Sequence, residues 1–321
     1  MKRILVIQRL HPEALRLLRE RPDVTFEVIT DTSPDSLANH IADADAVTIR
    51  DAPLPEQVLR AAPHLRVISR HGVGVDNIPI EYCTSRRLPV AVVGGVNTIA
   101  VAEHTMFLML AAARSGTQLD RAVRSGDFSA RSRITGVELK DRILLLVGFG
   151  RIGQEVAARA AAFGMRIVVF DPYVEPTKWP HVEFVPALAQ GLAVASVLSL
   201  HVPLTAATRN LIGGRELALL PRGAIVINTA RGGLLDEAAL LEALRSGHVR
   251  AAGLDTFAEE PLPPGHPLLT TENVVLTPHA AALTEETLLA MGLVTARNAL
   301  DGLDGKLDPT LVVNPSVLEA P

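Results

Sequence analysis

The sequence predicts an α/β protein built from two Rossmann-like domains, each a doubly wound parallel sheet. Short runs of β-branched and aliphatic residues alternate with helical patterns along the chain, and such alternation indicates parallel strands joined by helices. The chain has 321 residues, which is too long for one average domain and sufficient for two. Aromatic residues make up only 3% of it, so we expect aliphatic cores.

The first series of elements occupies the first hundred residues. Buried strands are predicted at residues 3–7, 25–29, 46–49, 66–70 and 89–93. Helices are predicted at 12–21, where Pro12 suits a first helical turn, and at 55–61. These elements define one parallel sheet with its connecting helices.

The second series follows a break that we place near Asn97-Thr98. Its strands are predicted at residues 142–147, 166–170, 196–200, 224–228, 251–254 and 274–276, and its longer helices at 99–113, 151–163 and 237–246. A last helix, 284–303, comes after this sheet is complete, so we expect it to return to the first domain. The predicted domains are therefore a discontinuous substrate-binding domain, 1–98 with 283–321, and a nucleotide-binding domain, 99–282.

Charge and composition narrow the class of protein. The formal net charge is −4 with no basic block, so neither nucleic acid nor an anionic membrane is an expected partner. No apolar run approaches the roughly 20 residues of a membrane span, and we expect a cytoplasmic protein. Cys83 is the single cysteine, which excludes an internal disulfide and favours a reducing compartment. We interpret Cys83 as a packing residue, and no metal site is predicted.

A glycine-rich segment opens the second series. Gly148-Phe149-Gly150-Arg151-Ile152-Gly153 follows an apolar strand and precedes a helix, the context in which G-x-G-x-x-G is specific for dinucleotides. Gly148 would allow the tight turn, Gly150 the approach of pyrophosphate, and Gly153 the packing of helix on strand. The helix amino terminus would then face the phosphates.

The acid at the end of the next strand selects the dinucleotide. Asp171 would accept hydrogen bonds from both ribose hydroxyls, whereas an NADP site would offer a basic residue there. Pro172 and Tyr173 follow Asp171, and no lysine occurs before Lys178. The sequence therefore predicts NAD as the cofactor.

Three later segments carry residues suited to 2-keto acid chemistry. Arg231 lies in Asn-Thr-Ala-Arg-Gly-Gly, Glu260 precedes Pro261, and His279 follows Pro278. An arginine can hold a carboxylate bidentately, and a histidine kept charged by a carboxylate can protonate a carbonyl oxygen. We predict that these three residues are catalytic.

With these segments, the chain resembles the D-isomer-specific 2-hydroxyacid dehydrogenase family over almost its whole length. The resemblance is carried by the fingerprint and the three catalytic segments, together with His71-Gly72-Val73-Gly74-Val75-Asp76-Asn77, Asn97-Thr98…Val101-Ala102-Glu103 and His201-Val202-Pro203-Leu204-Thr205. It implies that Arg231 binds the substrate carboxylate. It also implies that His279 exchanges the proton and Glu260 orients the imidazole.

The resemblance implies further contacts. Asp255 would bind the nicotinamide carboxamide. Backbone N–H groups of Gly72, Val73 and Gly74 would help hold the substrate carboxylate, and Asn97 would also bind the substrate. His201 would lie near the cofactor, although it could instead cap a strand. The remaining implied cofactor contacts are Arg151, Ile152, Val202, Pro203, Thr208, Thr229, Ala230 and Ala281. The helix at 99–113 would form the core of a homodimer.

Two arginines bear on the substrate. Arg50 and Arg70 end strands of the first domain, at positions where phosphoglycerate dehydrogenases of this family carry phosphate-binding arginines, which implies 3-phosphoglycerate as substrate. Alternatively, Arg50 forms a surface ion pair with Asp51 or Asp45. The function would then be that of a hydroxypyruvate or glyoxylate reductase, or of a dehydrogenase for another anionic 2-hydroxy acid. An NAD-sensing protein, as the family's corepressors are, is the alternative from a different class.

Overall fold

The computed structural model describes residues 1–180 and 182–319. The chain forms two compact units. The first unit comprises Met1–Asn97 and the segment from Leu283 onward, and the second comprises Thr98–Ala282. The last two residues of the predicted return segment lie outside the described residues.

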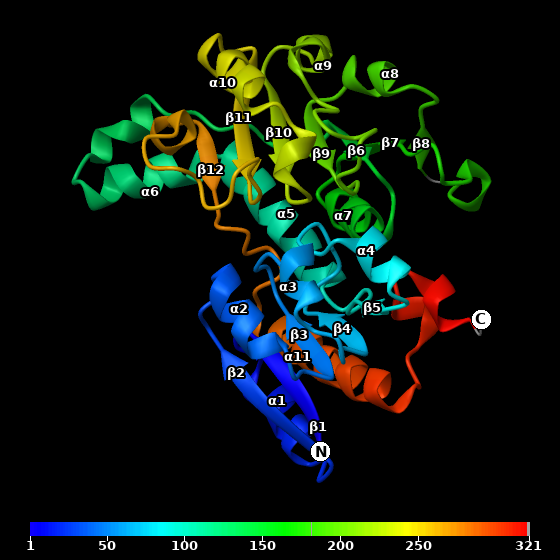
Figure 1. Cartoon of the computed structure of the whole chain (residues 1–321). Helices are drawn as coiled ribbons and strands as arrows, with labels where there is room; N and C mark the ends of the chain where they lie inside the picture. The colour runs from blue at the N-terminus through cyan, green and yellow to red at the C-terminus, as the bar shows by residue number, and fades with distance from the viewer. Residues whose placement is uncertain (181, 320–321) are drawn as a thin grey trace. The chain divides into compact units, whose positions relative to one another are not determined.

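The first unit contains a five-stranded parallel sheet in the order β2-β1-β3-β4-β5 (Figure 1). Its strands are β1 (Lys2–Ile7), β2 (Val24–Ile29), β3 (Ala46–Ile49), β4 (Val67–Arg70) and β5 (Val90–Ala91). Strand order reverses between β1 and β3, the position at which ligands bind in open α/β sheets. The carboxyl ends of these two strands lead into Gln8 and Arg50.

Helices cover both faces of this sheet. One face packs against α2 (Pro34–Ile41), α3 (Glu56–Arg60) and α4 (Ile80–Ser85). The other packs against α1 (Pro12–Arg19) and α11 (Glu285–Asp304). Because a Cβ on Gly302 would lie 2.5 Å from the Cβ of Val67, only glycine lets α11 approach β4 this closely.

The second unit contains a seven-stranded parallel sheet in the order β12-β11-β10-β9-β6-β7-β8. Its strands are β6 (Ile143–Val147), β7 (Arg166–Phe170), β8 (Glu183–Phe184), β9 (Val197–Leu200), β10 (Ala224–Asn228), β11 (Val249–Leu254) and β12 (Val274–Leu276). This is the dinucleotide-binding order extended by one strand, with the reversal between β6 and β9.

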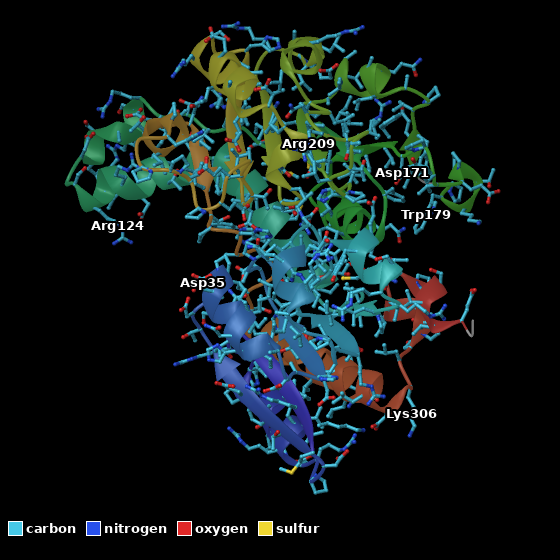
Figure 2. The ribbon with its side chains drawn as sticks, in the orientation of Figure 1. Asp35, Arg124, Asp171, Trp179, Arg209 and Lys306 are labelled. Carbon is cyan, nitrogen blue, oxygen red and sulfur yellow. The ribbon has the colours of Figure 1, made fainter. Side chains whose placement is uncertain are left out.

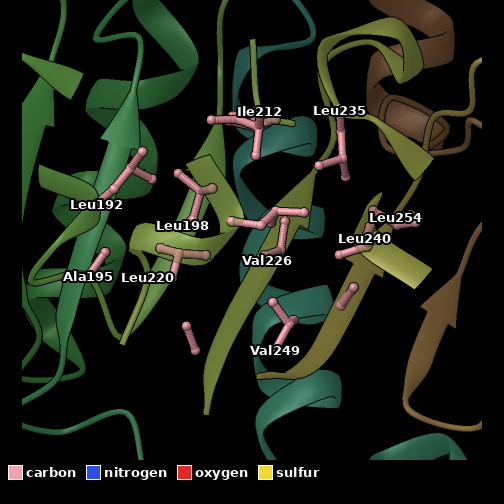
Figure 3. Packing of buried hydrophobic residues seen from close by; sticks show 14 of the residues in the cluster. Leu192, Ala195, Leu198, Ile212, Leu220, Val226, Leu235, Leu240, Val249 and Leu254 are labelled. Atoms are coloured by element: carbon pink, nitrogen blue, oxygen red, sulfur yellow. The ribbon is translucent and has the colours of Figure 1, made fainter. Parts of the chain in front are cut away.

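Two apolar layers enclose the second sheet. One contains α8 (Leu188–Leu192), α9 (Gly214–Leu219) and α10 (Glu237–Arg245), and Figure 3 shows part of this cluster around Val226 and Leu198. The opposite layer contains α5 (Thr98–Ala113) and α7 (Arg151–Ala162). The helix α6 (Gly116–Arg124) follows α5. Short 3-10 helices lie at Phe128–Ser132, Pro176–Lys178, Gly232–Leu234, Pro267–Thr270, Pro309–Leu311 and Pro315–Leu318.

The predicted fold class, two parallel α/β sheets, is confirmed. Sequence patterns did not anticipate β8, α2, α6, α8 or α9. The predicted strand at 89–93 is shorter, because beyond Ala91 the chain pairs instead with the carboxyl-terminal segment, where Val92 N–H donates to the carbonyl of Leu311 at 2.8 Å. Among the described residues, no helix has both the length and the apolar character needed to cross a membrane.

Candidate active site

The glycine loop of the second unit lies at the point of strand reversal. Gly148 has φ +98°, and a Cβ there would lie 2.5 Å from the carbonyl oxygen of His201, at the end of β9. A Cβ on Gly153 would lie 2.5 Å from the carbonyl oxygen of Gly148. Around Gly150, by contrast, a Cβ would meet no described atom within 4 Å. The two outer glycines are therefore required by packing, and the middle one faces open space that pyrophosphate could fill.

The helix after this loop offers backbone donors to an anion. Gly150 is the N-cap of α7 and supplies no side-chain cap, so the N–H groups of the first turn remain for a ligand. Arg151 and Ile152 occupy that turn. The loop's other side chain, Phe149, is buried, with its ring 5.1 Å from that of Trp179 (labelled in Figure 2), which anchors the turn in the apolar layer.

Asp171, labelled in Figure 2, follows β7 and contacts the glycine loop through Phe149. Its Oδ2 accepts a hydrogen bond from Phe149 N–H at 2.8 Å, and its Oδ1 accepts one from Tyr173 N–H at 2.9 Å. Each carboxylate oxygen keeps a further lone pair. The side chain is therefore fixed against the fingerprint and retains acceptor capacity for ribose hydroxyls.

His201 lies across the strand reversal from β6. Its Nε2 is 2.9 Å from the hydroxyl oxygen of Ser199. Burial lowers the pKa of His201 to about 4, so the ring is neutral at neutral pH. Both roles considered for His201 are compatible with this position: its side chain bonds to its own strand, and its backbone packs against Gly148.

Glu260 and His279 form a hydrogen-bonded pair. His279 Nδ1 lies 2.7 Å from Glu260 Oε2, and Glu260 Oε1 accepts Phe257 N–H at 2.9 Å. Burial would raise the pKa of Glu260, but the hydrogen bonds from His279 and Phe257 and the charges of His279 and Arg231 together lower it. The carboxylate is thus ionised, and it orients the ring so that Nε2 remains for a substrate. The imidazole is partly exposed, at 45% of its side-chain surface.

Arg231 follows β10 and is held by its own loop. Asn228 Nδ2 donates to the carbonyl of Arg231 at 2.8 Å, and Ala230 N–H donates to Asn228 Oδ1 at 3.0 Å. A Cβ on Gly232 would lie 1.8 Å from the carbonyl carbon of Phe257, so glycine allows the loops after β10 and β11 to touch. This contact places the guanidinium close enough for its charge to act on Glu260.

Asp255 is completely buried and organises the segment that carries His279. Its Oδ1 accepts from Thr277 Oγ1 at 2.6 Å and from Ala280 N–H at 2.8 Å, and its Oδ2 accepts from Ala281 N–H at 2.9 Å. His279 N–H donates to the carbonyl of Asp255 at 2.8 Å. Burial raises the pKa of Asp255, but these hydrogen bonds and one from His104 outweigh it and lower the pKa. His279 itself has φ +51°, which costs about 1–3 kcal/mol for a non-glycine residue.

The other predicted cofactor contacts lie on loops along the carboxyl-terminal edge of the second sheet. Thr208 Oγ1 accepts Thr205 N–H at 2.8 Å and donates to the carbonyl of Pro203 at 2.6 Å, so its hydroxyl shapes the loop that begins at Val202. Thr229 is buried, with its hydroxyl oxygen 2.8 Å from that of Thr105. Ala230 and Ala281 contribute the backbone hydrogen bonds already described.

Arg50 and Arg70 lie at the corresponding edge of the first sheet. Asp51 bonds Gln8 Nε2 at 2.6 Å, Asp45 accepts Arg3 N–H at 2.8 Å, and neither forms an ion pair with Arg50 within the described ranges. The surface ion pair considered as the alternative role of Arg50 is therefore absent among the described residues. The Arg50 guanidinium instead approaches the carbonyl of Arg9 at 3.5 Å. Burial and then the charges of Arg50 and Arg70 lower the pKa of His71 to about 4, so the two arginines share one neighbourhood.

The turn at Gly72 packs directly against the side chain of Arg70. A Cβ on Gly72 would overlap Arg70 Nη1, which donates to the carbonyl of His71 at 2.5 Å. Gly72 N–H donates to the carbonyl of Arg70 at 2.9 Å, so this donor, predicted for the substrate, is already used. In the part of the chain that the structure describes, the N–H groups of Val73 and Gly74 have no backbone acceptor. Asn97 lies in the turn before α5 and is partly exposed.

Three polar residues of the second unit were not predicted as site residues: Asn228, Thr277 and His104. The asparagine could have been found as a polar residue ending an apolar strand. Thr277 precedes the Pro278-His279 pair in the sequence, and no role was assigned to it. His104 is a polar residue within an apolar helix, next to Thr105, and no sequence pattern connects it to Thr277, 173 positions away.

Residues 106–281 match the model of the NAD-binding domain of D-isomer specific 2-hydroxyacid dehydrogenases. A D-3-phosphoglycerate dehydrogenase of Methanocaldococcus jannaschii is 43% identical over 99% of this chain and 60% of its own length. A glyoxylate reductase of Aeropyrum pernix is 41% identical over 97% of this chain and 95% of its own. The crystal structure of the TT0316 protein of Thermus thermophilus superposes with a TM-score of 0.90, at 39% identity, over 97% of this chain and 99% of that one.

The chain belongs to the D-isomer specific 2-hydroxyacid dehydrogenase family, and its second unit contains the family's NAD-binding domain. It spans about 60% of the length of the phosphoglycerate dehydrogenase that it matches. Both enzyme names recur among its relatives, so membership of the family does not distinguish the two substrates.

Proposed function

We propose that this protein catalyses NAD-dependent oxidoreduction at C2 of a D-2-hydroxy acid and the matching 2-keto acid. One observation carries the proposal: the 2.7 Å hydrogen bond between His279 Nδ1 and Glu260 Oε2, in loops that also bring Arg231 close to the carboxylate. These are the groups that proton transfer to a carbonyl oxygen beside a carboxylate requires.

Each residue has a role in this reaction. The Arg231 guanidinium binds the substrate carboxylate and polarises the adjacent keto oxygen. His279 donates a proton from Nε2 to that oxygen during reduction and accepts it during oxidation. Glu260 keeps the ring oriented and stabilises its protonated form. When bound, the cofactor would supply a hydride to C2 as NADH during reduction and would take one up from C2 as NAD during oxidation.

The cofactor fits the residues around the strand reversal. Open space over Gly150 and the donors of the first turn of α7 suit pyrophosphate. Asp171 suits the ribose hydroxyls of NAD and would repel a 2′-phosphate. Asp255 is assigned to the nicotinamide carboxamide, for which Oδ2 retains acceptor capacity beyond its bond to Ala281.

We propose further that the substrate carries a second anionic group, with 3-phosphoglycerate and 3-phosphohydroxypyruvate as the pair. Arg50 supports this, because its guanidinium makes no ion pair among the described residues and shares a neighbourhood with Arg70. A cation without a carboxylate partner at a ligand-binding strand end suits a phosphate. The similarity to a phosphoglycerate dehydrogenase agrees with this choice.

The substrate is tested by measuring NADH oxidation with 3-phosphohydroxypyruvate, hydroxypyruvate and glyoxylate under identical conditions. A higher kcat/KM for the phosphorylated compound is the expected result. A preference for hydroxypyruvate or glyoxylate would assign the protein to the alternative, a reductase of small keto acids, which its similarity to a glyoxylate reductase favours. Tight NADH binding with no turnover of any 2-keto acid would favour an NAD-sensing protein.

A homodimer is proposed from the exposed apolar side chains of the second unit. Phe107 on α5, Val123 on α6 and Phe128 just after it are 51%, 62% and 68% exposed. Large apolar side chains exposed on neighbouring elements are typical of interaction surfaces. Sedimentation at micromolar concentration should give the mass of two chains, and a stable monomer would refute this assembly.

A further inference from the structure

A partly buried series of hydrogen bonds runs from α5 to the carboxylate that organises the His279 segment. His104 Nε2 lies 2.9 Å from Thr277 Oγ1, and Thr277 Oγ1 donates to Asp255 Oδ1 at 2.6 Å. His104 Nε2 is also 3.5 Å from the same carboxylate oxygen. All three residues belong to the second unit, on α5, after β12 and after β11 respectively.

The direction of these hydrogen bonds is fixed by counting protons. A threonine hydroxyl has one hydrogen, and Thr277 gives it to the Asp255 carboxylate, which can only accept. The hydroxyl must therefore accept from His104, so Nε2 of His104 carries a hydrogen. A side chain without a donor at this position would leave the threonine oxygen and the carboxylate one bond short.

Asp255 connects these hydrogen bonds to the backbone around His279. Its carboxylate accepts from Ala280 and Ala281, the two residues after His279, and its carbonyl accepts the N–H of His279 itself. His279 has a left-handed backbone at φ +51°, a conformation that persists only where the surroundings enforce it. The orientation of the His279 ring therefore depends on the hydrogen bonds that Asp255 accepts from this segment.

We propose that His104 is a positioning residue for His279, acting through Thr277 and Asp255. This inference rests on the proposed function, since it assumes that His279 exchanges the substrate proton. The hydrogen bonds of His104 lead to Thr277 and Asp255, so its effect falls on the placement of the His279 segment. Misplacing a catalytic group by about 1 Å can lower a rate by about 100-fold.

The test compares His104→Phe with His104→Gln in the full chain. Phenylalanine keeps a ring beside Phe107, whose centroid is 5.5 Å from that of His104, and removes the donor. Glutamine restores an N–H donor near Nε2. We expect His104→Phe to lower kcat by about 10- to 100-fold with little change in KM for the 2-keto acid, and His104→Gln to recover most of kcat. His248→Gln is the matched control, because His248 bonds the carbonyl of Leu217 at 3.0 Å and takes no part in the hydrogen bonds between His104, Thr277 and Asp255.

Hydrogen exchange of the Ala280 and Ala281 amides provides a readout independent of turnover. We expect exchange about tenfold faster in His104→Phe than in the wild type, and near wild-type exchange in His104→Gln. If the wild type reduced no 2-keto acid, the proposed function would fail, and the exchange data would still decide whether His104 holds the segment. Equal kcat and exchange in His104→Phe, or a glutamine variant as impaired as the phenylalanine variant, would overturn the inference.

A second pair of variants covers the case in which His104→Phe does not fold. Thr277→Val removes the linking hydroxyl at nearly constant volume, and Thr277→Ser keeps it. The valine variant should reproduce the loss of kcat and the faster exchange, and the serine variant should not. Wild-type behaviour of Thr277→Val would contradict the proposed series of hydrogen bonds.

Discussion

The carboxyl-terminal edges of the two sheets differ in how their charged side chains are satisfied. In the second unit, Asp171, Asp255 and Glu260 each accept at least one backbone N–H, from another loop for the two aspartates and from the same loop for Glu260. In the first unit, Arg50 reaches only the carbonyl of Arg9 within the described residues. The carboxylates of the second unit are thus held in place by backbone hydrogen bonds, whereas the Arg50 guanidinium of the first unit has no carboxylate partner among the described residues. We infer that the reaction is specified by one unit and the choice of substrate by the other.

The largest expected effect is the loss of His279, the proposed proton donor. His279→Gln keeps a polar side chain of similar length but cannot supply an acidic proton near neutral pH. We expect kcat for 2-keto acid reduction to fall by about 10²- to 10⁴-fold, with NADH affinity little changed. Steady-state rates and a fluorescence titration with NADH separate these two quantities. A variant within threefold of the wild type would place the chemistry elsewhere.

Replacing the partner of His279 should cost less. Glu260→Gln preserves the hydrogen-bonding shape but removes the charge that stabilises the protonated ring. We therefore expect kcat to fall by about 10- to 100-fold, which corresponds to the 1.5–3 kcal/mol of a charged hydrogen bond. The loss should appear in kcat rather than in the KM for NADH. A kcat equal to that of the wild type would show that the Glu260 charge is dispensable.

The same substitution predicts a change in stability with pH. The pKa of Glu260 is lowered in the folded chain, so its contribution to stability is present above the unfolded value of about 4.3 and is lost as pH falls through the folded value. Thermal melting of the wild type and of Glu260→Gln should therefore differ near pH 6 and converge at strongly acidic pH. A difference that grew on acidification would contradict the lowered pKa.

Replacing Arg50 in the first unit should lower kcat/KM for a phosphorylated substrate and leave that for a small keto acid nearly unchanged. Arg50→Ala should lower kcat/KM for 3-phosphohydroxypyruvate by about 10- to 100-fold, because a charged hydrogen bond contributes about 1.5–3 kcal/mol. The rate with glyoxylate should change by less than threefold. Arg60→Ala is the control, since Arg60 is a surface residue paired with Glu56. Equal losses on both substrates would mean that Arg50 acts on the fold and not on a phosphate.

Sequence patterns were most informative for features that depend on residues close together in the sequence. The parallel sheets could be predicted because continuous buried runs recur between helices. Gly148 and Gly153 could be predicted because their places in the turn exclude a Cβ. The interaction of His104 with Thr277 could not be predicted, because it depends on how α5 packs beneath the second sheet. The short strand β8 could not be predicted either, since two residues carry no periodicity.

The structure also shows hydrogen bonds of predicted site residues that the sequence did not indicate. Asp255 was assigned to a ligand, yet most of its hydrogen bonds go to the segment around His279. Gly72 was expected to donate to the substrate, but its N–H bonds the carbonyl of Arg70. In both cases the residue type predicted a hydrogen bond, and only the folded backbone determined the partner. Cys83 is buried, which raises its thiol pKa to about 11, in agreement with a packing role.

The smallest expected effect concerns Asp171, whose carboxylate serves both the fold and the proposed ribose contact. Asp171→Asn keeps one acceptor for Phe149 N–H and removes the negative charge, so the glycine loop should hold its shape. Losing one ribose hydrogen bond of about 0.5–1.5 kcal/mol should raise the KM for NADH by about two- to tenfold and narrow the preference over NADPH. If the melting temperature fell while the NADH to NADPH ratio of kcat/KM stayed constant, Asp171 would serve the loop alone. In that case the acids of the second unit would serve the fold to a greater extent than we propose, and the difference from Arg50 in the first unit would be larger.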